Sequence, residues 1–294
     1  MQVAVLGLGK MGEPIARRLL DADHALCVWN RTTGRADGLA AAGAQVLPAP
    51  RDAWAHAETC ITMVLDDAAL LEVTTGPDGL LTPGGEGRVL VDMSTVSPGA
   101  SRTVAEAAER AGVGYLRAPV SGNPSVVEAG NLGIMVSGDE AVFARAEGLL
   151  RDIGPNVFYV GEGEEARVLK LALNLMIAGS AQAIAEALVL GESHGLDRAR
   201  MLEVMGASAV GSPFVKYKTA ALVRDDYAAT FTTYAMWKDL SLALAAGHEA
   251  NAPLPVTATI QQLLEGCLGS GWGEHDLMAL LPRLRREAGL DPGL

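Results

Sequence analysis

The sequence predicts an α/β domain with a mostly parallel sheet, followed by an all-α domain that is joined to it through a long helix. Three observations lead to this fold class. Short β-rich runs alternate with Ala-rich helical runs through the first half of the chain, which is typical of crossover units. A glycine-rich loop directly follows the first of these runs. After about residue 161 the strand signals nearly vanish, and helical periodicity replaces them.

The expected strands of the first half are residues 3–6, 25–29, 60–64, 89–92, 114–118, 134–137 and 156–160. Helical runs between them cover residues 13–21, 34–42, 100–111 and 140–152. In the second half we expect one long helix over residues 164–194, which Gly195 ends, and further helices over 198–205, 234–249, 256–268 and 276–286. The domains are therefore predicted to cover residues 1–162 and 163–294.

Charge and composition exclude several classes of partner. The chain has 294 residues and a net charge of −12, from 23 Lys and Arg against 35 Asp and Glu. Its field repels nucleic acids and anionic membranes, so we expect neither as a partner.

The apolar long helix carries Lys170 and Asn174, which would be costly to bury in a bilayer. This favours a helix that is buried within the protein. Three scattered cysteines and no basic leader predict a cytoplasmic protein without a signal peptide.

Residues 7–12 read Gly-Leu-Gly-Lys-Met-Gly, directly after a strand and directly before a helix. In such a G-x-G-x-x-G loop the first glycine allows a tight turn, and the second lets the backbone approach a pyrophosphate. The third glycine lets helix and strand pack closely, and the helix N-terminus offers N–H groups to the phosphates. The loop predicts a Rossmann-type dinucleotide-binding domain, whose cofactor contacts include Gly7, Leu8, Gly9, Lys10, Met11 and Gly12.

The end of the second expected strand concerns the choice between NAD and NADP. It reads Trp29-Asn30-Arg31-Thr32 and carries no Asp or Glu. An NAD site usually has a carboxylate there, whereas an arginine accommodates the 2′-phosphate of NADP. A charge-assisted hydrogen bond from Arg31 would contribute roughly 1.5–3 kcal/mol. We therefore expect NADP, with NAD less favoured and with Asn30, Arg31 and Thr32 at the cofactor; the alternative is that Arg31 is a solvated loop residue.

Two further loops follow expected strands. Ser94 and Thr95 come after residues 89–92, and the run Ser121-Gly122-Asn123 comes after residues 114–118. Residues at the carboxyl ends of parallel strands face the ligand crevice. Hydroxyl and backbone N–H groups there can bind a substrate carboxylate. The alternatives are helix capping by Ser97, which leaves Ser94 and Thr95 unexplained, and a polar turn at residues 121–123.

Lys170 and Asn174 lie four residues apart on the long helix, so their side chains share one face. A buried lysine is costly unless it is paired or used in catalysis. Burial also lowers the pKa of a lysine toward the operating pH, which suits a general acid or base. The structural alternative is a lysine that extends to solvent near the helix start, with a hydrogen-bonded interior asparagine. Lys216 and Lys218 are expected at the surface.

Several segments together resemble the β-hydroxyacid dehydrogenases, the family of 3-hydroxyisobutyrate dehydrogenase. They are the glycine loop with its helix start (7–16), Asp-Met-Ser-Thr-Val-Ser-Pro (92–98), Ala-Pro-Val-Ser-Gly (118–122), Lys-x-x-x-Asn (170–174), and Phe231 with Lys-Asp-Leu (238–240). Their order and spacing cover nearly the whole chain. The resemblance implies a Rossmann domain, a long helix and a helical domain, in dimers or tetramers.

The resemblance also implies an activity. Members interconvert a 3-hydroxy acid and its semialdehyde or keto acid by hydride transfer to or from NAD(P), on a small carboxylate-bearing substrate. Lys170 would be the general acid and base, with Asn174 holding the lysine or the substrate oxygen in line. The expected substrate contacts are Ser94, Thr95, Ser121, Gly122, Asn123, Lys170 and Asn174. Val64, Leu65, Thr95 and Lys238 complete the expected cofactor contacts.

This chain departs from the family pattern at three places. Arg117 stands where members commonly have Asp before Ala-Pro-Val-Ser-Gly, Asn123 replaces a second glycine, and Asn131 stands in a later Gly-Thr-Leu motif. These positions lie in or near the substrate loop. They therefore concern the choice of substrate more than the type of reaction.

Other functions are less favoured by the same residues. Imine reductases share this architecture but usually replace the lysine that Lys170 represents. A 6-phosphogluconate dehydrogenase shares Lys-x-x-x-Asn, but its chain is typically longer. A non-catalytic NADP-binding sensor or scaffold would be expected to lose the lysine. The histidines lack H-E-x-x-H or related spacing, so no metal is expected.

Overall fold

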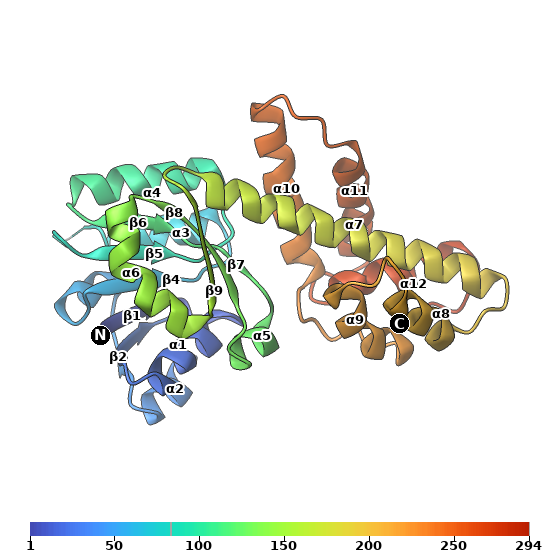
Figure 1. The fold of residues 1–294 in the computed structure, drawn as a ribbon, viewed down its shortest axis with the longest axis horizontal. Helices are drawn as coiled ribbons and strands as arrows, with labels where there is room; N and C mark the ends of the chain where they lie inside the picture. The colour runs from blue at the N-terminus through green and yellow to red at the C-terminus, as the bar shows by residue number, and fades with distance from the viewer. Residues whose placement is uncertain (83, 294) are drawn as a thin grey trace. The chain divides into compact units, whose positions relative to one another are not determined.

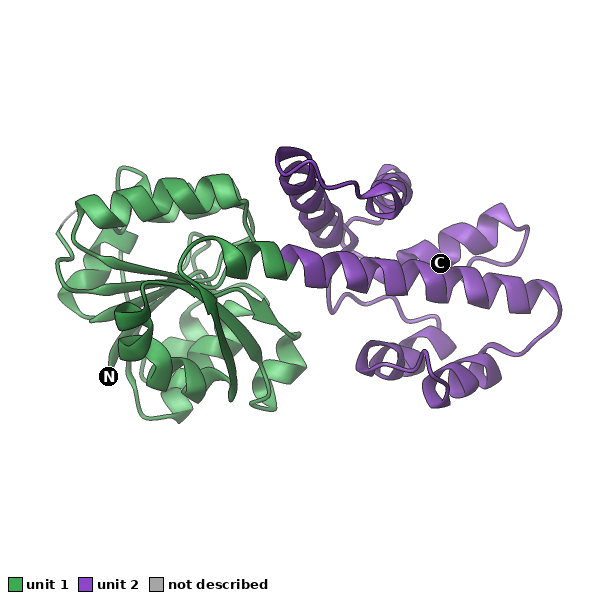
Figure 2. Ribbon diagram, turned by 45° about the horizontal axis from the view of Figure 1, so that its top comes forward, with its two compact units in different colours: residues 1–170 green, residues 171–294 purple. Residues whose placement is uncertain are grey.

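The computed structural model describes residues 1–82 and 84–293. The chain divides into two compact units, residues 1–170 and 171–294, which Figure 2 shows in green and purple. Each unit has hydrophobic clusters of its own. The domain limits expected from the sequence, with a boundary between residues 162 and 163, stay a prediction.

Unit 1 contains the sheet. Its strands are β1 (Gln2–Leu6), β2 (Ala25–Trp29), β3 (Gln45–Val46), β4 (Thr59–Thr62), β5 (Val89–Asp92), β6 (Gly114–Arg117), β7 (Val120–Ser121), β8 (Gly133–Gly138) and β9 (Asn156–Gly161). Its helices are α1 (Gly12–Asp21), α2 (Asp37–Ala41), the 3₁₀ helix η1 (Pro50–Ala55), α3 (Asp67–Thr75), α4 (Pro98–Arg110), α5 (Pro124–Glu128) and α6 (Glu140–Ile153). Every expected strand and helix of this region is present. The short elements β3, β7, η1 and α5, and the helix α3, were not expected.

The sheet has the order β3-β2-β1-β4-β5-β6-β8-β7, and β9 pairs with β8. Strands β1 to β6 pair in parallel, while β8 runs antiparallel to β6 and β7. The order 3-2-1-4-5-6 is that of the Rossmann fold, and the direction of the connections reverses beside β1. The predicted mostly parallel α/β sheet is therefore confirmed.

Helices cover both faces of this sheet, as Figure 1 shows. Alternate residues of β1 pack against helices on the two opposite faces. Val3 and Val5 belong to one buried cluster with Ile15 of α1, and Ala4 belongs to a second cluster with Val104 of α4. A strand that is buried on both faces is apolar at every position, which is what the Val-Ala-Val-Leu run provides.

The C-terminal part is helical, as predicted. Helix α7 (Glu165–Ser193) begins in unit 1 and continues into unit 2, which also holds α8 (Arg198–Ala207), α9 (Pro213–Val223), α10 (Thr233–Glu249), α11 (Pro255–Gly269), η2 (Leu277–Ala279) and α12 (Leu280–Glu287). Ala178, Ala181, Ala185 and Leu188 of α7 are spaced three or four residues apart and lie in the buried cluster of unit 2. By length and composition α7 could cross a membrane, but the core helix of a globular protein passes the same test.

One expectation about the lysines is wrong. Lys216 is exposed, as expected, but Lys218 is only 3% exposed. Its Nζ lies 2.6 Å from both carboxylate oxygens of Asp276. Burial lowers the pKa of Lys218, and the carboxylate opposes that change. The expectation failed because α9 was not predicted, so its buried face could not be assigned.

Candidate active site

The carboxyl ends of the central strands lie in one row of the sheet. Trp29, Leu6, Thr62, Asp92 and Arg117 are successive register partners across β2, β1, β4, β5 and β6. In an open parallel sheet, ligands bind in the crevice outside this edge, where the strand order reverses. The loops that leave this row contain most of the unit 1 residues that the sequence assigned to a site.

The glycine loop has the geometry that its sequence predicts. Gly7 has φ +102°, a backbone conformation that favours glycine. A Cβ at Gly12 would overlap the carbonyl oxygen of Gly7, so the close approach of helix and strand requires a glycine there too. A Cβ at Gly9, in contrast, would meet no atom of the described residues within 4 Å. Gly9 therefore faces open space, into which a pyrophosphate fits.

The first turn of α1 also suits an anion. Among the described residues, no side chain caps this turn, whose N-cap is Met11. By comparison, Ser97 and Asp139 cap α4 and α6 with their side chains. Backbone N–H groups at an uncapped N-terminus can bind phosphate oxygens. The residues of this loop thus fit the pyrophosphate of a dinucleotide.

Asn30 connects the end of β2 to the glycine loop. Its Oδ1 accepts a hydrogen bond from the Leu8 N–H at 2.9 Å, and its Nδ2 donates to the Thr32 carbonyl at 3.0 Å. Arg31 and Thr32 are exposed. The structure thus holds Asn30 against the glycine loop, whereas the contact of Arg31 with a 2′-phosphate stays a prediction.

Ser94 connects two loops at the edge of the sheet. Its side chain is buried, and its Oγ accepts a hydrogen bond from the Val64 N–H at 2.9 Å. Val64 and Leu65 follow β4, and Leu65 is exposed. Thr95 is half-buried. Ser97 caps α4, because its Oγ accepts from the Ala100 N–H at 3.0 Å.

The expected substrate loop, residues 121–123, runs from the end of β7 to the N-cap of α5. Ser121 is half-buried and Gly122 is exposed. Asn123 caps α5, with its Oδ1 accepting from the Val126 N–H at 3.1 Å and from the Ser125 hydroxyl at 2.7 Å. The side-chain oxygen of Asn123 is therefore committed to the cap. A substrate contact by this side chain would fall to its Nδ2 group.

Arg117, the departure before Ala-Pro-Val-Ser-Gly, lies within an ion pair. Its Nε and Nη2 donate to Oε1 of Glu164 at 2.9 and 2.7 Å. Its guanidinium also lies 4.8 Å from the ring centre of Tyr115. The charge of Arg117 is thus balanced within unit 1, so it does not supply an uncompensated positive charge to the substrate loop.

Lys170 and Asn174 both lie on α7, one turn apart, as predicted. Lys170 is half-buried, and Asn174 is 2% exposed. In unit 2, Asn174 Nδ2 donates to Oδ2 of Asp239 at 2.5 Å, and Nζ of Lys238 lies 2.8 Å from Oδ1 of Asp239. Sequence reasoning assigned no role to Asp239, although it is adjacent to Lys238 in the motif of residues 238–240. That adjacency was the available signal.

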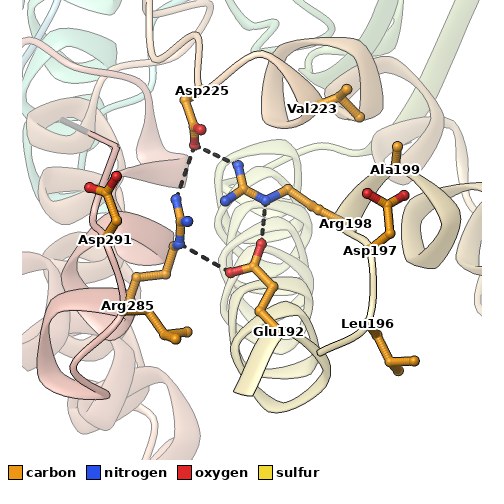
Figure 3. A pocket seen from close by; sticks show the side chains of 10 residues that line it. Glu192, Leu196, Asp197, Arg198, Ala199, Val223, Asp225, Arg285 and Asp291 are labelled. Atoms are coloured by element: carbon orange, nitrogen blue, oxygen red, sulfur yellow. Dashed lines mark hydrogen bonds and ion pairs between the residues drawn. The ribbon is translucent and has the colours of Figure 1, made fainter. Parts of the chain in front are cut away.

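Unit 2 also contains a charged cavity of about 420 Å³, seen in Figure 3. Arg198 forms ion pairs with Glu192 and Asp225, and Arg285 forms ion pairs with the same two carboxylates. The residues lining this cavity include none of the site residues that the sequence predicts. Its arginines are balanced by neighbouring acids, so we assign no binding role to it.

The fold and the glycine loop define a dinucleotide-binding protein, and comparisons with known proteins specify its class. Residues 2–161 match the family model for the NAD binding domain of 6-phosphogluconate dehydrogenase. Residues 164–284 match the model for the NAD-binding region of NADP-dependent 3-hydroxyisobutyrate dehydrogenase. The two matches together span both the sheet and most of the helices.

Individual proteins resemble the chain over nearly its whole length. The 2-(hydroxymethyl)glutarate dehydrogenase of Eubacterium barkeri is 34% identical over 282 residues, which cover 96% of this chain and 94% of that protein. The 3-hydroxyisobutyrate dehydrogenase of Pseudomonas aeruginosa is 35% identical over 268 residues, covering 89% and 90%. A solved structure of Psf3 in complex with NADP⁺ and 2-OPP has a TM-score of 0.88 at 26% identity, covering 96% and 99%.

The chain therefore belongs to the β-hydroxyacid dehydrogenase family, as its motifs indicated. It is an NAD(P)-dependent dehydrogenase or reductase that acts on CH–OH groups.

Proposed function

We propose that the protein interconverts a small 3-hydroxy acid and its semialdehyde or keto acid, with NADP as the cofactor. The observation that carries this proposal is the Lys170–Asn174 pair on α7, in which the buried Asp239 orients Asn174. The family membership supplies the context of hydroxy acid oxidoreduction. The bound nicotinamide would supply or accept the hydride.

Lys170 handles the proton in this proposal. In reduction, its Nζ donates a proton to the carbonyl oxygen of the substrate as the hydride reaches the carbonyl carbon, so that the alcohol forms. In oxidation, the neutral amine accepts the hydroxyl proton. A positioned general acid or base contributes about 10²–10⁴-fold to a rate. Asn174 keeps Lys170 or the substrate oxygen in line for this transfer.

The substrate carboxylate is assigned to the loop at Ser121, Gly122 and Asn123. Hydroxyl and amide N–H donors hold a carboxylate without a full counter-charge. This assignment suits a chain whose overall charge is −12, because the loop does not depend on the field of the whole protein. On the loop after β5, the half-buried Thr95 completes the proposed substrate contacts. The fully buried Ser94 would support that loop through its bond with the Val64 N–H rather than touch the substrate with its side chain.

The preference for NADP rests on the end of β2. Asn30 fixes this segment against the glycine loop, and the next residue is the exposed Arg31. The similar protein Psf3 was solved with NADP⁺, which supports the same assignment here. We also propose a homodimer or homotetramer, which sedimentation analysis would test.

A substrate panel tests the function directly. NADPH and NADH consumption would be followed by absorbance with methylmalonate, succinate and tartronate semialdehydes and with glyoxylate. The reverse reaction would be measured with the matching hydroxy acids. Turnover of at least one of these compounds, with a higher kcat/KM for NADPH, is expected. A cyclic imine is assayed alongside the panel. Turnover of that imine alone, or cofactor binding without turnover of any compound, would contradict the proposal.

A further inference from the structure

Arg167 is a large charged side chain that is almost completely buried, at 1% exposure, in the first turn of α7. Its Nη2 donates to Oδ2 of Asp92, which is fully buried, and to the Tyr115 hydroxyl at 3.0 Å. Its Nη1 donates to the Ser94 carbonyl oxygen at 2.6 Å. A buried guanidinium is costly unless its charge and its donors have partners. Asp92, Tyr115 and Ser94 provide those partners for Arg167.

The partners of Arg167 lead to several loops at the edge of the sheet. Asp92 also accepts hydrogen bonds from the Thr62 hydroxyl at 2.7 Å and from the Ser94 N–H at 3.1 Å. Ser94 in turn accepts from the Val64 N–H. One buried group thus connects the loop after β4, the loop after β5 and the start of α7.

Helix α7 carries Lys170 one turn after Arg167. We infer that Arg167 is a positioning residue, which sets the loop at Ser94 and Thr95 relative to the helix start that bears Lys170. The inference rests on the proposed function for the role of Lys170, but the cross-link itself lies within unit 1. A planar guanidinium suits this task, because its fork of donors reaches a carboxylate and a carbonyl at once. A lysine ammonium has no such fork.

The role of Arg167 differs from that of a simple stabilising ion pair, and a charge-free double variant separates the two. Arg167→Met alone leaves Asp92 buried without its counter-charge and is expected to lower stability. Asp92→Asn with Arg167→Met removes both charges, so its thermal stability should recover. In the double variant the loop after β5 should nevertheless remain more mobile than in the wild type, because no arginine donates to the Ser94 carbonyl oxygen.

The first readout is hydrogen–deuterium exchange in the cofactor-free protein. Faster exchange at residues 63–66 and 93–97 is expected in both Arg167→Met and the double variant. The second readout is steady-state kinetics, in which kcat should fall by at least about 10-fold, because misplaced reacting groups are inefficient. Arg167→Lys, which retains the charge, should show an intermediate loss of kcat. It also serves if Arg167→Met does not fold.

Arg198→Met is the matched control, because Arg198 is likewise an arginine held in ion pairs, with Glu192 and Asp225, but lies in the cavity of Figure 3 in unit 2. It should lower thermal stability while leaving exchange at residues 93–97 and kcat unchanged. A double variant that regains wild-type exchange and wild-type kcat would overturn the inference. The exchange result does not require turnover, so it remains decisive for Arg167 even if the substrate panel disproves the proposed function.

Discussion

Asn174 donates a hydrogen bond from Nδ2 to Oδ2 of Asp239, and both side chains are buried. Because Nδ2 is held by the carboxylate, the amide of Asn174 has a fixed orientation. The same carboxylate lies 2.8 Å from Nζ of Lys238, the other basic residue of the predicted site. Asp239 thus supports two proposed functional residues at once. A catalytic side chain needs such a hydrogen-bonded neighbour to hold it in its working orientation.

Asp239→Ala should therefore reduce both stability and activity. The donor of Asn174 and the ammonium of Lys238 would lose their shared partner, so the free energy of unfolding should fall by about 1–3 kcal/mol. Urea unfolding measures this change, and kcat should fall as well. Glu203→Ala is the control, because the exposed Glu203 forms an ion pair with the exposed Arg200 and its loss should change stability by less than about 1 kcal/mol. Equal effects of the two substitutions would contradict the role given to Asp239.

The same substitution at two glycines of one loop should affect different properties, stability at Gly12 and cofactor affinity at Gly9. Gly12→Ala places a Cβ against the Gly7 carbonyl oxygen, so the midpoint of thermal unfolding should fall. Gly9→Ala meets no described atom within 4 Å, so that midpoint should stay near the wild-type value. Its Cβ enters the space assigned to the pyrophosphate, so the Kd for NADPH should rise, as fluorescence titration would show. Wild-type affinity in Gly9→Ala would refute the placement of the pyrophosphate.

Arg31→Ala should affect the two cofactors differently. Loss of a charge-assisted hydrogen bond worth roughly 1.5–3 kcal/mol would raise the KM for NADPH at least about 10-fold. The KM for NADH should hardly change, because NADH lacks the 2′-phosphate. Raising the ionic strength should likewise reduce the preference of the wild type for NADPH over NADH, because salt screens the attraction between Arg31 and the 2′-phosphate. An equal change for both cofactors would show that Arg31 does not read the 2′-phosphate.

The sequence predicted the sheet well because its strands are short apolar runs between turn signals. The bounds of β2 and β5 match the expected ranges. Strands β3 and β7 have two residues each, too few to show any periodicity, and they depend on pairing with neighbours. Helix α9 was missed for a related reason, since its apolar residues do not mark one clear face.

The residues that support the proposed site could not be predicted from local patterns in the sequence. Lys170 and Asn174 follow a local spacing that a single helix explains. In contrast, Arg167 and Asp92 are 75 residues apart in sequence, and Asn174 and Asp239 are 65 apart. Local patterns do not report such pairs, so their partnership became visible only in the folded chain.

Lys170 is the residue on which the proposed chemistry depends, so its replacement is the most direct measurement. In Lys170→Ala, kcat for the best substrate of the panel should fall by at least about 10²-fold, because the general acid is lost. The Kd for NADPH should remain that of the wild type, since the glycine loop is unchanged. Lys216→Ala, at an exposed lysine, should retain wild-type turnover. Near-normal turnover in Lys170→Ala would contradict the account.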